Sequence, residues 1–327
     1  MTAVDGALPG GSIGATIGID IGGTSVRAAV LDGAATIGAS LRDTTPGTER
    51  DTEDLLVTLI TKLAATQPVS AVGLAVAGFV SRDRQRVMFA PHLAWRDAPV
   101  PQRISARVGQ PVVMDHDVNS AAWAEYRRGV SAGSSIALLI ALGTGIGAGL
   151  VVGGEIYRGA YGVAPELGHL TVVPGGRPCA CGKRGCWERY CSGTALAQIA
   201  QLQMVDHDAP VLRRLSGDDP ATVTGTMVAV AATEGDPVAL AAMDELGHWL
   251  AAGLSLVTDV LDPEVIVIGG GVSAAAGMFL PLAVSEFAGS ITGAGHRPLP
   301  RVELARFGDR AGIIGAGLLA AEALHLE

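Results

Sequence analysis

The stretch from Ser131 to Gly154 carries no charged residue and is apolar enough to raise the question of a membrane-spanning helix. Within it, glycine recurs at every second position over residues 143–149. Glycine is costly inside a helix but suits a place where two buried strands flank a tight backbone loop. The sequence therefore predicts a strand over 136–142, a glycine loop, a strand over 147–152 and a hairpin turn at 153–154.

The remaining apolar segments alternate between strand and helix lengths, which is typical of an α/β protein. A second glycine turn, at Gly22 and Gly23, separates short apolar strands over 17–21 and 26–31, so the chain contains two strand–turn–strand units of one kind. This repetition suggests two lobes that each offer a glycine loop to the same ligand. Further expected elements are strands over 69–76, 112–114 and 265–268, and helices over 51–66, 121–128 (capped by Asn119), 239–261 and 312–326.

Length and charge exclude several classes of protein. The 327 residues, 49% of them hydrophobic, supply enough core for two lobes or one large α/β unit. A net charge of -9 with 23 thinly spread basic residues argues against a nucleic-acid partner. Residues 1–15 read as a flexible lead rather than a signal peptide, because they have neither a basic segment nor a long apolar one. We therefore expect a cytoplasmic protein without a membrane partner.

One short window combines an imidazole with three thiols, from His169, Cys179, Cys181 and Cys186. This is the ligand set of a closed tetrahedral zinc site, which replaces an apolar core in a small loop-rich lobe. Free thiols or a disulfide are the alternatives, and a reducing compartment favours the metal. Cys191 is the remaining cysteine; it is either a plain thiol or a fourth ligand in place of His169.

The two glycine loops suit the binding of phosphate groups. The first joins a carboxylate, bare backbone amides and a hydroxyl over residues 20–24, and the second offers a similar nest at Gly143, Thr144 and Gly145. No P-loop motif occurs. A relaxed dinucleotide fingerprint does occur over 143–148, but that motif must open a helix and here it leads into a strand. We therefore reject a nicotinamide enzyme.

Five ordered motifs resemble those of the ROK family (repressors, open reading frames and kinases), most closely its bacterial glucokinases. The resemblance runs from about residue 16 to the C-terminus. The motifs are Asp20-Ile-Gly-Gly-Thr24, Leu142-Gly-Thr-Gly-Ile-Gly147, Glu166-Leu-Gly-His169, the cysteine cluster that ends at Glu188, and Ile268-Gly-Gly-Gly-Val-Ser273.

The resemblance implies an α/β protein of the actin-like ATPase (ribonuclease H-like) fold, with two α/β lobes, a central cleft and a small zinc-bound lobe. The small lobe would span 16–122, the large lobe 123–310, and a C-terminal helix over 311–327 would return to the small lobe. It also implies transfer of a phosphoryl group from ATP to a hexose, with Mg²⁺ and a structural Zn²⁺, in a homodimer or homotetramer.

Carried over by motif, the general base would be Asp117, which could accept the hydroxyl proton as the oxygen attacks the γ-phosphate. Asp115 competes for this role, and we favour Asp117 because Asn119 follows it by two residues. Asp20 would orient Mg²⁺ through water. The expected substrate-binding residues are Gly78, His116, Asn119, Glu166, His169 and Glu188. The expected nucleotide-binding residues are Gly22, Gly23, Thr24, Gly143, Thr144, Gly145, Gly269, Gly270 and Gly271.

Three residues depart from the family pattern. His116 and His92 each stand where the family has asparagine, and Pro165 stands where glycine is usual. An imidazole is bulkier than an amide and titrates near neutrality, so the sugar need not be glucose: mannose, allose, fructose, glucosamine and N-acetylated hexosamines are the alternatives. Polyphosphate is an alternative donor.

The family offers two alternatives to a kinase, a repressor and a sugar-binding protein without catalysis. A repressor would need a DNA-binding domain before the first glycine loop, where the sequence has a short lead. A sugar-binding protein that has lost catalysis would not need to retain both phosphate loops. We therefore expect a hexose kinase.

Overall fold

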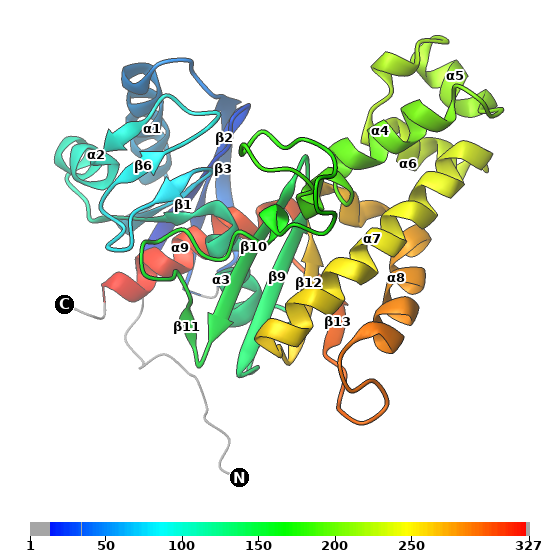
Figure 1. The fold of residues 1–327 in the computed structure, drawn as a ribbon. Helices are drawn as coiled ribbons and strands as arrows, with labels where there is room; N and C mark the ends of the chain where they lie inside the picture. The colour runs from blue at the N-terminus through cyan, green and yellow to red at the C-terminus, as the bar shows by residue number, and fades with distance from the viewer. Residues whose placement is uncertain (1–13, 34, 325–327) are drawn as a thin grey trace. The chain divides into compact units, whose positions relative to one another are not determined.

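The computed structural model describes residues 14–33 and 35–324 (Figure 1). The chain divides into two compact units: the first runs up to Ala121 and resumes at Gly312, and the second spans Ala122–Ala311. Each unit contains a five-stranded sheet. Residues 1–13 of the expected N-terminal lead lie outside the described residues, and Ala15 already belongs to the first strand.

The sheet of the first unit has the strand order β3-β2-β1-β4-β8. The expected hairpin around Gly22 and Gly23 is confirmed: its two strands are antiparallel, and the first of them also pairs in parallel with β4. The elements of this unit are β1 (Ala15–Ile21), β2 (Ser25–Leu31), β3 (Ile37–Thr44), α1 (Glu49–Ala64), β4 (Val69–Val76), β5 (Phe79–Val80), β6 (Val87–Phe89), β7 (Arg96–Ala98), α2 (Val100–Val108) and β8 (Val112–His116).

The C-terminal helix α9 (Ala311–Ala323) packs closely on this sheet. A Cβ at Gly18 would lie 2.0 Å from the carbonyl oxygen of Ile313, and one at Gly73 would lie 1.9 Å from that of Ala316. Only glycine permits so close an approach of strand and helix backbones. The helix expected at the C-terminal end is confirmed, and it ends at Ala323.

The sheet of the second unit has the order β11-β10-β9-β12-β13. The uncharged stretch folds as predicted into an antiparallel hairpin, and its first strand pairs in parallel with β12. Both glycines of the 153–154 turn have positive φ, 58° and 87°, as a tight hairpin turn requires. The strands are β9 (Ile136–Leu142), β10 (Ile146–Val152), β11 (Glu155–Ile156), β12 (Val265–Gly269) and β13 (Arg301–Leu304).

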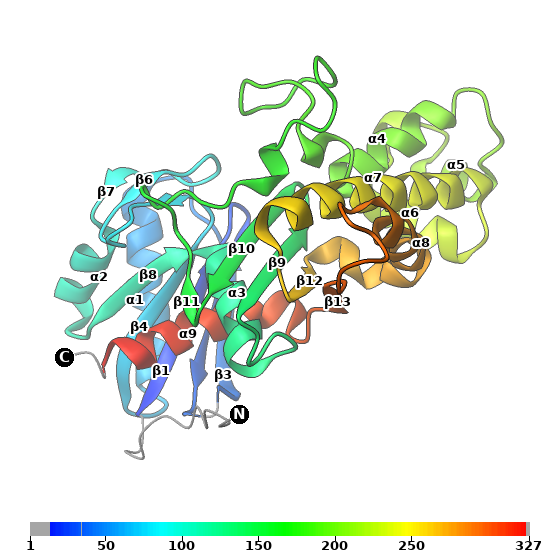
Figure 2. The same cartoon turned by 60° about the horizontal axis from the view of Figure 1, so that its bottom comes forward.

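The helices that follow the second hairpin lie together, as Figure 2 shows, and α7 contacts α4, α6 and α8. They are α4 (Gly193–Gln203), α5 (Pro210–Ser216), α6 (Gly225–Thr233), α7 (Pro237–Leu261) and α8 (Ala276–Ser290). Within the described residues, one helical stretch, Gly271–Ser290, is long and apolar enough to cross a membrane, judged by length and composition alone. Its Phe279 and Phe287 belong to the buried core of the second unit.

Several helix boundaries differ from those expected. Thr48 and Asp236 cap α1 and α7 with their side chains, so both helices begin two residues before the expected positions. The helix α3 (Asp117–Arg128) begins four residues before the expected start, and Asn119 lies inside its first turn. The expectation that Asn119 caps this helix is therefore wrong.

Candidate functional site

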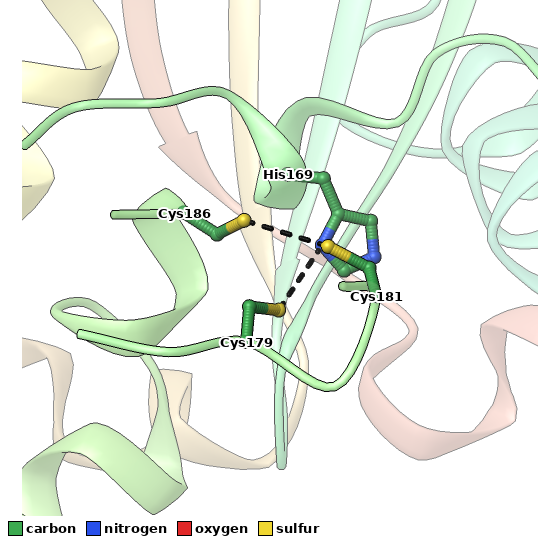
Figure 3. Close-up of side chains that lie close together, drawn as sticks. All are labelled: His169, Cys179, Cys181 and Cys186. Carbon is green, nitrogen blue, oxygen red and sulfur yellow. Dashed lines mark hydrogen bonds between the residues drawn. The ribbon is translucent and has the colours of Figure 1, made fainter. Parts of the chain in front are cut away.

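Four side chains of the second unit converge on one point: His169, Cys179, Cys181 and Cys186 (Figure 3). Their ligand atoms all lie within 4.8 Å of one another. The Sγ atoms of Cys181 and Cys186 are 3.6 Å apart, and Sγ of Cys179 lies 3.7 Å from Nδ1 of His169. A tetrahedral zinc ion with Zn–S bonds of about 2.3 Å places its sulfur ligands roughly 3.8 Å apart, so this donor set fits zinc.

Short-range backbone bonds shape the loop that carries the cysteines. The amide of Cys179 donates to the carbonyl of Lys183 at 2.9 Å, and the amide of Gly182 donates to the carbonyl of Cys179 at 3.1 Å. An isolated bridge pairs Thr171 with Cys186. A bound metal would add stability to a loop that is held by such short-range bonds.

The thiols of Cys179 and Cys191 have different surroundings. Burial raises the pKa of Cys179 to about 12, so a metal must displace the thiol proton in order to bind. Cys191 is fully buried, its Sγ lies 3.9 Å from the carbonyl oxygen of Leu246, and burial raises its pKa. It is a buried thiol outside the convergent set, as in the first of the two alternatives that the sequence left open.

Two carboxylates flank the imidazole of His169. Oε1 of Glu188 lies 3.5 Å from Nδ1, and Oε2 of Glu166 lies 3.8 Å from Nε2. Glu166 immediately precedes the short helix η1 (Leu167–His169), and Glu188 lies in η2 (Trp187–Arg189). Nδ1 therefore faces the thiols while Nε2 faces away from them. We call Glu166, His169 and Glu188 the polar wall.

The turn from β8 into α3, in the first unit, carries two further carboxylates with unlike surroundings. The Asp115 side chain is buried, and its Oδ1 accepts hydrogen bonds from the amide of His116 at 2.9 Å and from the side-chain amide of Asn119 at 3.0 Å. The Asp117 side chain is 32% exposed, and its Oδ1 accepts from the amide of Val118 at 2.8 Å. Asn119 therefore hydrogen-bonds to Asp115, although its position in the sequence was the reason to prefer Asp117 as the base.

The first glycine loop is braced by neighbouring polar groups. The amide of Gly22 donates to the carbonyl of Ser25 at 3.1 Å, and the hydroxyl of Thr45 donates to the carbonyl of Gly22 at 2.6 Å. Asp20 pairs with Arg27 at 2.5 Å across the hairpin. Sequence reasoning missed this arginine, although the register of a hairpin that turns at 22–23 places position 27 opposite position 20.

The second glycine loop borders a hollow of about 1120 Å³ in the second unit. Gly143, Thr144 and Gly271 line it, as expected for nucleotide-binding residues, whereas Gly145, Gly269 and Gly270 are absent from its lining. A Cβ at Gly270 would lie 2.4 Å from the carbonyl oxygen of Leu142, so close packing of the backbone explains this glycine. No lining residue carries a charge.

The hollow is also lined by the starts of α4 and α6, which sequence reasoning did not single out. Both begin with a hydroxyl cap followed by glycine and threonine: Ser192 and Thr224 each accept a hydrogen bond from the amide three residues on. This repeated pattern is the signal that could have found them. Two residues from each start line the hollow: Gly193, Thr194, Gly225 and Thr226.

The ROK family matches residues 16–323 of the chain. The chain belongs to the ROK family. It is 38% identical over 312 residues to a glucokinase of Streptomyces coelicolor, covering 95% of this chain and 98% of that one. It is 34% identical over 319 residues to a glucokinase of Halalkalibacterium halodurans, covering 93% and 94%. A crystal structure of a ROK family glucokinase from Streptomyces griseus in complex with glucose and AMPPNP aligns with a TM-score of 0.86 and 38% identity, covering 94% of this chain and all of that one.

The ROK neighbours establish the expected actin-like ATPase fold for this chain. Two of its departures from the ROK pattern lie in the first unit. A Cβ at Gly23 would lie 2.6 Å from Cβ of His92, so this histidine packs against the first glycine loop. Nε2 of His116 lies 3.0 Å from Oδ1 of Asp117. Gly78, expected to bind substrate, packs against Ala90, where a Cβ would lie 2.7 Å from the alanine Cβ.

Proposed function

We propose that this protein is an ATP-dependent glucokinase, which converts D-glucose and ATP to glucose 6-phosphate and ADP. The observation that carries this proposal is the arrangement of the second unit. Its polar wall suits sugar hydroxyls, and the glycine loop that this wall contacts borders a hollow of nucleotide size. The glucokinases of Streptomyces coelicolor and Halalkalibacterium halodurans support the assignment through near full-length similarity. The Streptomyces griseus structure binds glucose and a nucleotide analogue on the same fold.

In this proposal Asp117 is the general base. Its partly exposed carboxylate accepts the proton of the sugar 6-hydroxyl as that oxygen bonds to the γ-phosphorus, while the bond from phosphorus to the bridging oxygen breaks and ADP leaves. Asp115 is unsuited to this step, because it is buried and two internal donors occupy one of its oxygens. Asp115 instead fixes the turn that presents Asp117.

We propose that the polar wall hydrogen-bonds the sugar. For His116 and Asn119, in the first unit, we propose a sugar-binding role because the family resemblance implies it. His169 would hold zinc through Nδ1 and leave Nε2 for the sugar, because a metal on one ring nitrogen fixes the tautomer of the other. Bound zinc holds the cysteine loop and takes no part in the chemistry.

ATP would lie in the neutral hollow, with its phosphates at the Gly143–Gly145 loop. For residues 22–24 of the first unit we propose phosphate binding because the family resemblance implies it. Asp20, held by Arg27, would orient Mg²⁺ through water, and the bound ion would supply positive charge to the phosphates. We further propose a cytoplasmic homodimer or homotetramer, which size-exclusion chromatography with light scattering would test.

A coupled assay with ATP and Mg²⁺ tests the proposal across glucose, mannose, allose, fructose, glucosamine and N-acetylated hexosamines. We expect the highest kcat/KM with glucose. A higher value with another hexose would keep the kinase assignment and replace the substrate. Failure to phosphorylate any of these sugars, by a folded protein loaded with zinc, would overturn the proposed function.

A further inference from the structure

The second glycine loop and the polar wall meet at one contact. Gly145 lies between β9 and β10, and a Cβ at this position would lie 2.4 Å from Oε2 of Glu188. Cβ atoms do not approach another heavy atom so closely. The carboxylate of Glu188 can therefore hold this position only because residue 145 has no side chain.

The other oxygen of the same carboxylate faces the metal ligands. Oε1 of Glu188 lies 3.0 Å from Sγ of Cys179 and 3.5 Å from Nδ1 of His169. One side chain thus contacts the glycine loop with one oxygen and the metal-facing side of His169 with the other. If residue 145 displaced Oε2, the position of Oε1 beside His169 would change as well.

The backbone that carries Glu188 is firmly held. Trp187 is fully buried, and its Nε1 donates to the carbonyl of Trp249 at 2.8 Å. The hydroxyl of Ser192 donates to the carbonyl of Glu188 at 2.8 Å, and the amide of Gly193 donates to the carbonyl of Gly143 at 2.7 Å. With its backbone fixed in this way, Glu188 can respond to a larger residue at position 145 only by moving its side chain.

We propose that Gly145 is a positioning residue for the sugar, which acts by leaving space for the carboxylate of Glu188. The second glycine loop and the polar wall thereby share one side chain, that of Glu188, within the second unit. This inference rests on the proposed function, in which Glu188 hydrogen-bonds the sugar. It assigns Gly145 a role in addition to the phosphate binding proposed for its loop.

Gly143 provides a matched control in the same loop, because a Cβ there meets nothing within 4 Å. The glucose Kd is measured by calorimetry on nucleotide-free protein with its zinc content verified. We expect Gly145→Ala to raise this Kd about tenfold, equivalent to the loss of one charge-assisted hydrogen bond. Gly143→Ala should leave the glucose Kd within about twofold of wild type, whatever it does to nucleotide binding.

A shorter carboxylate should relieve the collision. In the Gly145→Ala background, Glu188→Asp should therefore improve glucose affinity, although the same change in wild type should weaken it. Equal glucose affinity in Gly145→Ala and wild type would overturn the inference, as would additive effects of the two substitutions. Wild-type protein that neither binds nor phosphorylates glucose would instead overturn the proposed function.

A second measurement does not require a substitution at position 145. Glu188→Gln removes a negative charge beside the loop proposed to hold phosphates, so sugar-free protein should bind ADP about threefold more tightly. An unchanged or weaker ADP affinity in a folded, zinc-loaded Glu188→Gln variant would contradict contact between this carboxylate and the nucleotide loop.

Discussion

Nε2 of His116 lies 3.0 Å from Oδ1 of Asp117, and both side chains are partly exposed. The imidazole therefore contacts the carboxylate oxygen that is proposed to accept the proton. The ROK pattern has asparagine at this position, whose shorter amide presents its donor at a different angle. This chain therefore places a ring nitrogen against its proposed general base.

We predict that His116→Asn lowers kcat, because it removes the ring nitrogen that contacts Oδ1 of Asp117. The shorter amide of asparagine does not reproduce this contact, so the carboxylate is held less well for proton transfer. The loss should be about threefold to tenfold at constant pH, because both side chains are partly exposed. His92→Asn is the matched control, since it also restores the family residue but should change kcat less. Equal kcat values for wild type and His116→Asn would contradict the prediction.

The two aspartates of the β8–α3 turn should respond differently to the same substitution. Asp117→Asn should lower kcat by about 10²–10⁴-fold with little change in glucose Kd or thermal stability, as expected for loss of a general base. Asp115→Asn should lower the Tm, because it alters a buried acceptor that holds Asn119 and the amide of His116; the cost is about 1–3 kcal/mol. Stopped assays and thermal melts on both variants distinguish these outcomes. Near-wild-type turnover in Asp117→Asn would refute its assignment as the base.

Local sequence patterns were sufficient to predict both hairpins and the cluster of four candidate metal ligands. Glycine at every second position excludes a helix, and the spacing from His169 to Cys186 matches one kind of site. Asn119 shows where such reasoning fails. Its position suggested a helix cap and was the reason to prefer Asp117 as the base, but its amide reaches the buried Asp115. A side chain with several donors and acceptors can bind any of several neighbours, and packing decides which one it contacts. The spacing of residues in the sequence does not encode that packing.

Contacts between distant segments account for most of what the sequence did not predict. The hollow depends on where α4 and α6 begin, and those helices lie far along the chain from Gly143. Likewise, the separation of 43 positions between Gly145 and Glu188 gives no hint that one must be small for the other to fit. Family motifs named both residues as functional, but only the packed structure relates one to the other.

The purified protein should carry about one zinc ion per chain, as four convergent ligands require. Cys181→Ala should lose the metal, lower the Tm and raise the KM for glucose, because the loop behind His169 is then unsupported. Cys191→Ala should keep the metal, since this buried thiol lies outside the ligand set. Metal analysis by mass spectrometry checks each variant. Full activity in a folded, metal-free protein would contradict a structural role for zinc.

ATP should be a far better phosphoryl donor than polyphosphate. A polyphosphate chain carries a negative charge on each phosphate and needs lysine or arginine along its path, whereas the lining of the hollow beside Gly143 has no charged residue. A nucleoside is neutral apart from its phosphates and suits such a lining. We expect kcat/KM for polyphosphate to be at least about 100-fold below that for ATP, a difference of roughly 2.7 kcal/mol. Steady-state rates at saturating glucose measure both donors, and equal values would show that the hollow does not select the donor.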